Sequence, residues 1–197
     1  MSMLDEHGVV LGVASLVLGQ GMEQRHAELV VRAGVDAGAA ALDTARAYAS
    51  VEDDAVGERL AVVAEERRPG IPVITKAGHY RLGTASWDAD GSAARLRRDA
   101  ERSVEVLGGP PALLLLHRTD QVEDVAASVR ALDELRREGL ALRIGVSNAS
   151  VEVLEQLEGV APLDAVQNRL GLGVDSFAEY RYCRERGIDF FAYAPFG

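Results

Sequence analysis

The stretch that decides the fold covers residues 40–48 and reads Ala40-Ala41-Leu42-Asp43-Thr44-Ala45-Arg46-Ala47-Tyr48. Its first three residues form a short apolar run, which is typical of a buried strand. The run stops at the carboxylate of Asp43, and Tyr48 follows five residues later in the loop that we expect after the strand. A buried strand gains nothing from a carboxylate at its tip, so the pattern indicates a functional group there.

Two further apolar runs stop at a polar residue in the same way. The run 73–75 is followed by Lys76, and the run of four leucines at 113–116 is followed by His117. If the strands share one sheet, their ends converge at one edge. We therefore expect a proton-transfer site built from four side chains, Asp43, Tyr48, Lys76 and His117.

Short apolar runs alternate with longer amphipathic segments along the whole chain. The predicted strands are Val9–Ala14, Ala40–Thr44, Val73–Lys76, Ala112–His117, Leu142–Ser147, Asp164–Asn168 and Asp189–Ala194. The predicted helices are Gln24–Ala37, Asp54–Arg68, Ser92–Leu107, Val122–Glu138, Ser150–Glu158 and Ser176–Arg186. Strict strand–helix alternation predicts an α/β fold with a parallel sheet, either doubly wound or a (β/α)8 barrel.

Two observations favour the barrel of TIM type over the doubly wound sheet. Gly19-Gln20-Gly21 and Gly171-Leu172-Gly173 both lack the third glycine of a dinucleotide-binding fingerprint, and no Walker A sequence is present. Polar residues at strand ends fit the barrel, because its active site is built at the C-terminal mouth. The segment His79–Ser92, with Tyr80 and Trp87, is predicted as a mouth loop that is solvated or contributes to substrate choice.

The composition excludes several classes of function. The formal net charge of −10 and the pI of about 4.9 argue against a nucleic-acid or anionic-membrane partner, since both need a basic surface. The only cysteine, Cys183, cannot form an intramolecular disulfide. The acidic N-terminus does not resemble a signal peptide, and the apolar stretch Val9–Leu18 is shorter than the roughly 20 residues of a membrane span. We therefore predict a cytoplasmic protein. We predict no metal site, because no histidine pair has metal-ligand spacing.

The four polar residues suggest a specific chemistry. A free tyrosine has a pKa of about 10, too high for an efficient proton donor at neutral pH. The ammonium of Lys76 would stabilise the phenolate and lower that pKa, and Asp43 would hold the lysine in place and keep it charged. His117 could hydrogen-bond a substrate carbonyl. No side chain delivers hydride, so a nicotinamide or flavin is implied.

The same segments resemble the aldo/keto reductase family. The resemblance rests on six segments in order: Leu42–Tyr48, Ile74–Gly78, Leu114–His117, Gly145–Asn148, Val166–Asn168 and Ala192–Pro195. It implies reduction of an aldehyde or ketone with NADP (NAD possible), or the reverse oxidation, on a TIM barrel without metal. It implies Tyr48 as general acid/base, tuned by Lys76 and Asp43, with His117 orienting the carbonyl. By the same resemblance, the nicotinamide carboxamide would be held by Ser147, Asn148 and Gln167, and Tyr193 would stack on the ring.

The chain stops at Gly197, directly after the seventh predicted strand. We therefore expect residues 1–197 to form a single barrel domain that lacks the eighth strand and the C-terminal helices, which in the family supply most contacts to the pyrophosphate and adenosine. Two alternatives to the reductase stay open. One is a truncated, non-catalytic or regulatory relative with weak cofactor binding. The other is a Schiff-base aldolase with Lys76 as nucleophile.

Overall fold

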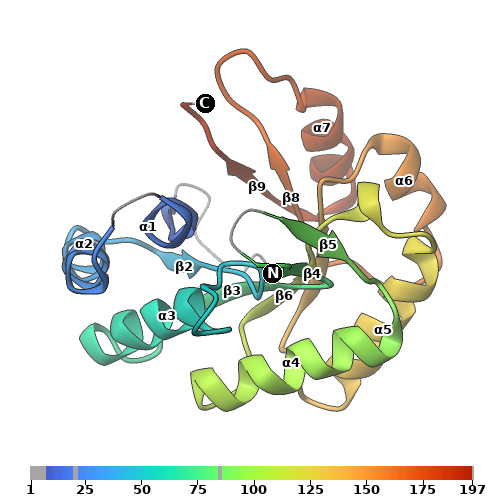
Figure 1. Cartoon of the computed structure of the whole chain (residues 1–197). Helices are drawn as coiled ribbons and strands as arrows, with labels where there is room; N and C mark the ends of the chain where they lie inside the picture. Colours follow the sequence, from blue (N-terminus) through green and yellow to red (C-terminus); the bar gives the residue numbers. More distant parts are fainter. Residues whose placement is uncertain (1–7, 20–21, 84–85, 197) are drawn as a thin grey trace.

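The computed structural model describes residues 8–19, 22–83 and 86–196 (Figure 1). Seven strands form one parallel sheet in the order β1-β2-β3-β6-β7-β8-β9. They are β1 (Val10–Gly12), β2 (Ala41–Asp43), β3 (Val73–Ala77), β6 (Leu113–Leu116), β7 (Ile144–Ser147), β8 (Ala165–Arg169) and β9 (Asp189–Tyr193). The sheet curves with helices on its outer side, which confirms the predicted (β/α)8-type barrel with seven strands.

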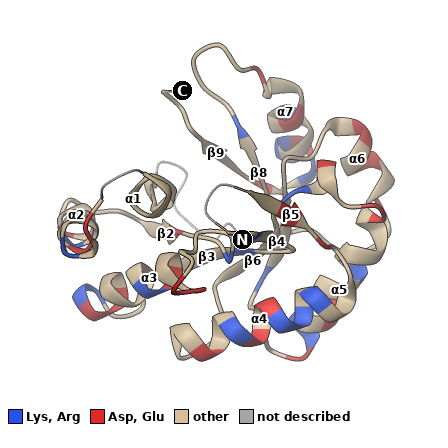
Figure 2. Ribbon diagram, in the orientation of Figure 1, with Lys and Arg blue, Asp and Glu red and all other residues tan. Residues whose placement is uncertain are grey.

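The helices cover the convex face of the sheet (Figure 1). They are α1 (Ala14–Leu18), α2 (Gln24–Asp36), α3 (Val56–Arg67), α4 (Ala93–Leu107), α5 (Val125–Arg137), α6 (Val151–Gln156) and α7 (Phe177–Arg186), with a 3-10 turn η1 (Thr119–Gln121). Charged residues of both signs are interspersed on α2, α3, α4, α5 and α7, while the strands carry few (Figure 2). Among the described residues, no helix has the length and apolar character needed to cross a membrane.

The burial of the strands explains their apolar sequences. Strands β3, β6 and β7 are buried along their whole length, as expected for parallel strands covered on both faces. Helix α4 shows the complementary pattern, because it buries Leu96, Ala100 and Ser103 on one side. It begins at Ser92, whose hydroxyl accepts a hydrogen bond from the Arg95 amide, and ends at Gly108 in the left-handed conformation.

Parallel pairing brings the carboxyl ends of the strands to one edge of the sheet. Asp43 of β2 is in register with Ile74 of β3, and Lys76 of β3 is in register with Leu115 of β6. Ser147 at the end of β7 is in register with Gln167 of β8. The residues that end the predicted strands therefore lie at the same mouth.

Three local features differ from the sequence-based expectation. The segment after Lys76 is a two-stranded antiparallel hairpin, β4 (His79–Arg81) with β5 (Trp87–Ala89), instead of a loop. Its strands have three residues each, too few for an alternation of apolar and polar residues to be recognised in the sequence. The short helix α1 was not expected, and the predicted strand Val9–Ala14 ends at Gly12, before this helix begins. Helix α5 starts at Val125 and not at Val122, because the Asp124 side chain caps it by accepting from Ala127 N.

Candidate active site

The structure brings the four expected side chains together at the mouth of the sheet. Asp43 ends β2, Lys76 lies in β3, His117 follows β6, and Tyr48 lies in the loop between β2 and α3. The Lys76 ammonium is 2.7 Å and 2.9 Å from the two carboxylate oxygens of Asp43 and 5.2 Å from the centroid of the Tyr48 ring. The rings of Tyr48 and His117 meet edge to face at 5.9 Å between centroids.

The residues expected to contact the nicotinamide lie beside this cluster. Asn148 has a left-handed backbone (φ 60°), and its side-chain Nδ2 donates to the His117 carbonyl oxygen at 2.9 Å and to Ser147 Oγ at 3.2 Å. The Tyr193 hydroxyl donates to Asn148 Oδ1 at 2.6 Å. Gln167 Nε2 donates to Asp43 Oδ1 at 3.1 Å, so one hydrogen bond joins the two groups of residues.

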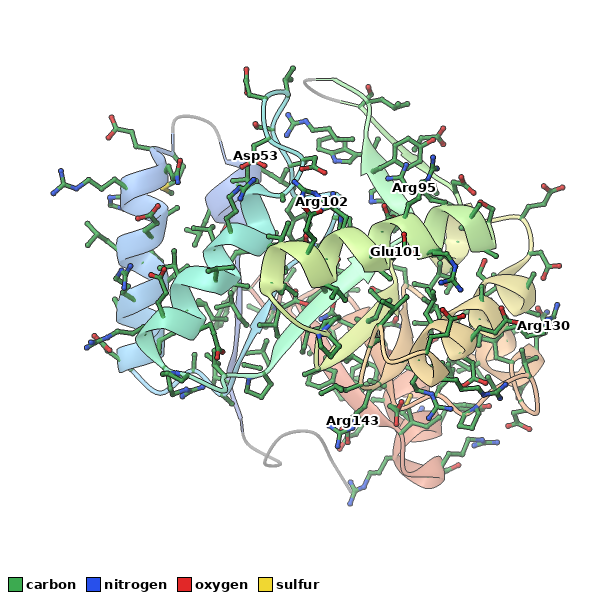
Figure 3. All side chains as sticks on the ribbon, turned by 90° about the horizontal axis from the view of Figure 1, so that it is seen from below. Asp53, Arg95, Glu101, Arg102, Arg130 and Arg143 are labelled. Atoms are coloured by element: carbon green, nitrogen blue, oxygen red, sulfur yellow. The ribbon has the colours of Figure 1, made fainter. Side chains whose placement is uncertain are left out.

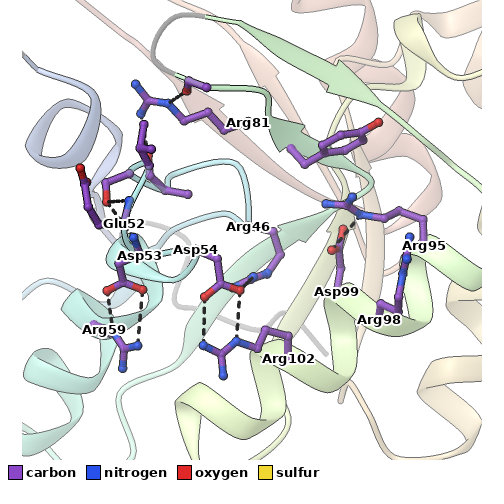
Figure 4. Close-up of a pocket in the computed structure, with 15 residues that line it drawn as sticks. Arg46, Glu52, Asp53, Asp54, Arg59, Arg81, Arg95, Arg98, Asp99 and Arg102 are labelled. Carbon is purple, nitrogen blue, oxygen red and sulfur yellow. Dashed lines mark hydrogen bonds and ion pairs between the residues drawn. The ribbon is translucent and has the colours of Figure 1, made fainter.

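A cavity of about 1040 Å³ lies next to the Tyr48 loop (Figure 4). None of the four clustered side chains lines it. Its wall consists mainly of arginines and carboxylates, including Arg46, Asp54 and Arg102, and Figure 4 shows Asp54 between the two guanidinium groups. The wall includes Asp53, which lies in the loop before α3, and Arg95 and Arg102, which lie on α4 (Figure 3).

Comparison with known proteins places the chain in a family. The model of the aldo/keto reductase family matches residues 9–197. The chain belongs to the aldo/keto reductase family. An aldo-keto reductase of Gibberella moniliformis is 29% identical over 189 residues, covering 93% of this chain and 56% of the relative. An uncharacterized oxidoreductase of Schizosaccharomyces pombe is 29% identical over 157 residues, covering 78% of this chain and 50% of the relative.

Solved structures of the family share the fold. The glycerol dehydrogenase of Gluconobacter oxydans superposes with a TM-score of 0.79 at 26% identity, covering 93% of this chain and 58% of that protein. A Bombyx mori aldo-keto reductase in complex with NADP superposes with a TM-score of 0.76 at 21% identity, covering 96% of this chain and 62% of that protein. The chain thus spans about half the length of the curated relatives it matches.

Lys76 is the only lysine of this aldo/keto reductase chain, and it is 2% exposed. Its ammonium donates to both oxygens of Asp43 and, at 2.9 Å, to the Thr44 carbonyl oxygen. Burial disfavours the charged form, but attraction to Asp43 and Tyr48 outweighs it, so the pKa of Lys76 lies above its usual value. The lysine is therefore held as a cation inside the barrel mouth.

The pKa of Tyr48 differs from the sequence-based expectation. Lys76 does lower it, as predicted, but burial of the phenol raises it by more, and the Asp43 carboxylate adds to the increase. The net result is a pKa above the usual value of 10. The sequence showed the ammonium but not the depth of burial, so the expected net decrease was wrong.

His117 is held as a neutral imidazole. Burial and the nearby Lys76 ammonium place its pKa well below 6.5. Its Nδ1 atom is buried without a hydrogen-bond partner among the described residues. The ring of His79, the first residue of the hairpin, meets that of His117 edge to face at 4.8 Å. The sequence favoured a solvated loop for His79, and only the unpredicted hairpin brings it here.

Proposed function

We propose that this protein reduces an aldehyde or ketone to an alcohol with a nicotinamide cofactor, or catalyses the reverse oxidation, with Tyr48 as general acid/base. The observation that carries the proposal is the single buried cluster at the mouth. A phenol lies there between a cation held by a carboxylate and a neutral imidazole. Membership of the aldo/keto reductase family supports the same chemistry.

Each side chain has a distinct task in this proposal. The Tyr48 hydroxyl gives its proton to the substrate oxygen as the carbonyl becomes an alkoxide. The Lys76 ammonium stabilises the phenolate that remains, and Asp43 keeps that ammonium charged and fixed in place. The neutral imidazole of His117 donates a hydrogen bond to the carbonyl oxygen, which orients it and stabilises developing negative charge.

The cofactor supplies the hydride, and we propose that it is NADP, with NAD as the alternative. The amide and hydroxyl groups of Ser147, Asn148 and Gln167 suit a carboxamide, which both donates and accepts hydrogen bonds. The half-buried ring of Tyr193 offers a planar surface for a nicotinamide. NADP is preferred because solved relatives from Bombyx mori and Klebsiella pneumoniae are complexes with NADP.

The Schiff-base aldolase is the weaker candidate. An aldolase lysine must lose its proton to attack a carbonyl, so such sites lower the lysine pKa. Here the pKa of Lys76 is raised and its ammonium makes three hydrogen bonds. Borohydride trapping of an aldehyde on Lys76 would favour the aldolase over the reductase.

NADPH oxidation by the purified chain with 4-nitrobenzaldehyde tests the proposal. Tyr48→Phe removes only the hydroxyl, so we expect turnover to fall by about 10²–10⁴-fold. Tyr180→Phe, on α7, is the matched control and keeps full turnover. NADPH binding, followed by its fluorescence, stays unchanged in both variants.

The outcomes separate the alternatives. Turnover that is unaffected by Tyr48→Phe would rule out Tyr48 as the general acid. A wild-type chain that binds NADPH weakly and shows no turnover would instead indicate the non-catalytic relative.

A further inference from the structure

A carboxylate outside the cluster is completely buried beneath the Tyr48 loop. Glu58 lies in the first turn of α3 and has 0% of its surface exposed. Its Oε2 accepts from Arg46 Nη1 at 2.6 Å, and its Oε1 accepts from the hydroxyls of Thr75 at 3.0 Å and Ser103 at 2.5 Å. Charged groups are costly to bury unless they are fully paired, so this network demands an explanation.

The partners of Glu58 are close neighbours of the candidate catalytic residues. Thr75 directly precedes Lys76 in β3, and strand alternation directs the two side chains to opposite faces. Arg46 lies two residues before Tyr48, and its backbone amide donates to the Lys76 carbonyl oxygen at 3.0 Å. Glu58 thus connects the strand that carries the ammonium with the loop that carries the phenol.

The start of α3 also contacts the Tyr48 backbone directly. The Gly57 amide donates to the Tyr48 carbonyl oxygen at 2.9 Å. A Cβ atom on Gly57 would lie 2.9 Å from Tyr48 Cβ and 2.5 Å from Thr44 Oγ1, so helix and loop are packed as closely as glycine allows. A shift of Glu58 would therefore move the Tyr48 loop as well as Arg46.

Arg46 is held from its other side by the wall of the cavity. Its Nη2 donates to Asp54 Oδ2 at 2.7 Å, and Asp54 in turn accepts from Arg102 Nη2 at 2.9 Å (Figure 4). The guanidinium is 7% exposed and is fixed between two carboxylates. Its position leaves the loop between Asp43 and Tyr48 little freedom to move.

We propose that Glu58 is a positioning residue that acts through Arg46 and Thr75 to hold Tyr48 at its distance from Lys76. This inference rests on the proposed role of Tyr48. Neither Glu58 nor Arg46 is among the residues placed at the catalytic cluster, so their effect on the chemistry is indirect. A network that served only the stability of the fold would be replaceable by apolar side chains, which often restore or increase stability at buried ion pairs.

The test uses the fact that Lys76 is the only lysine. Labelling with [¹⁵N]lysine gives one side-chain signal, that of Lys76 Nζ, and requires no enzymatic activity. Tyr48→Phe should move this signal, because the phenol is a neighbour of the ammonium. We expect Glu58→Gln and the double variant Arg46→Met/Glu58→Met to move this signal too. Both variants should reduce turnover about tenfold or more and change KM by no more than about twofold, because a displaced catalytic side chain slows the chemical step.

Matched controls and a second variant make the result decisive. Glu66 lies on α3, as Glu58 does, and forms an exposed ion pair with Arg32 of α2; Glu66→Gln should leave the signal and turnover unchanged. If Glu58→Gln fails to fold, the apolar double variant carries the test. A folded double variant with wild-type Lys76 signal and turnover would overturn the proposal. A Tyr48→Phe variant that leaves the signal in place would instead contradict the proposed function.

Discussion

Replacing Asp43 by asparagine tests the buried ion pair at the centre of the site. The substitution keeps the side-chain shape but removes the negative charge beside Lys76, which is 2% exposed. Breaking a buried pair from one side costs about 3–5 kcal/mol, because the remaining charge is left uncompensated. For a chain of this length, 1 kcal/mol corresponds to about 2–4 °C in Tm, so we expect a decrease of about 6–20 °C near neutral pH.

The pH dependence of stability gives the sharper signature of the same change. In the wild type, the folded-state pKa of Lys76 lies above the usual 10.5. The stability it contributes is therefore fully present below pH 10.5 and is lost as the pH rises through the folded-state pKa. In the variant, burial acts without Asp43, and we expect the folded-state pKa to lie below 10.5. Stability should then decrease as the pH falls from 10.5 through the new pKa.

Thermal unfolding followed by circular dichroism over a series of pH values measures both effects. Asp36→Asn, in an exposed ion pair with Arg67, is the matched control and should change Tm little. The apolar double variant Asp43→Leu/Lys76→Met should recover most of the lost stability. An Asp43→Asn protein with wild-type Tm and wild-type pH dependence would refute the reasoning.

Two further predictions concern the surroundings of the cluster. Gly57→Ala should lower the free energy of unfolding by about 1–3 kcal/mol, because the added Cβ would lie 2.5 Å from Thr44 Oγ1. Gly12→Ala is the control, since its Cβ meets nothing within 4 Å and should leave the free energy of unfolding nearly unchanged. Denaturant unfolding measures both. His117→Gln should weaken the dependence of stability on pH below pH 7. The folded-state pKa of His117 is well below 6.5, so the wild type loses stability as the pH falls through 6.5. A Tm that declines equally in both proteins between pH 7 and 5 would contradict this.

The sequence predicted the mouth of the barrel well for a physical reason. Parallel strands must all end at one edge, so polar residues that stop apolar runs are brought together by topology alone. Asp43, Lys76 and His117 follow this rule. Tyr48 was placed correctly in the loop, and Ser147 and Gln167 lie in register on neighbouring strands.

Features that depend on tertiary contacts could not be predicted. Glu58 looks like an ordinary acidic residue in the first turn of a helix, and nothing in the sequence indicates that Arg46, Thr75 and Ser103 surround it. The net pKa of Tyr48 depends on how deeply the phenol is buried, which periodicity does not report. His79 reaches His117 only because the segment after Lys76 folds into a hairpin.

The β4–β5 hairpin gives this chain an optical probe at its mouth. Trp87 is the only tryptophan, and its indole nitrogen donates to the Ala47 carbonyl oxygen at 3.3 Å, next to Tyr48 in the chain. Arg81 of the same hairpin donates to the Ala49 carbonyl oxygen at 2.6 Å. Tryptophan emission therefore reports whether the hairpin rests on the Tyr48 loop, whereas circular dichroism reports the helices and the seven-stranded sheet. If the hairpin leaves the Tyr48 loop before the barrel unfolds, the tryptophan emission maximum should shift before the circular dichroism signal changes.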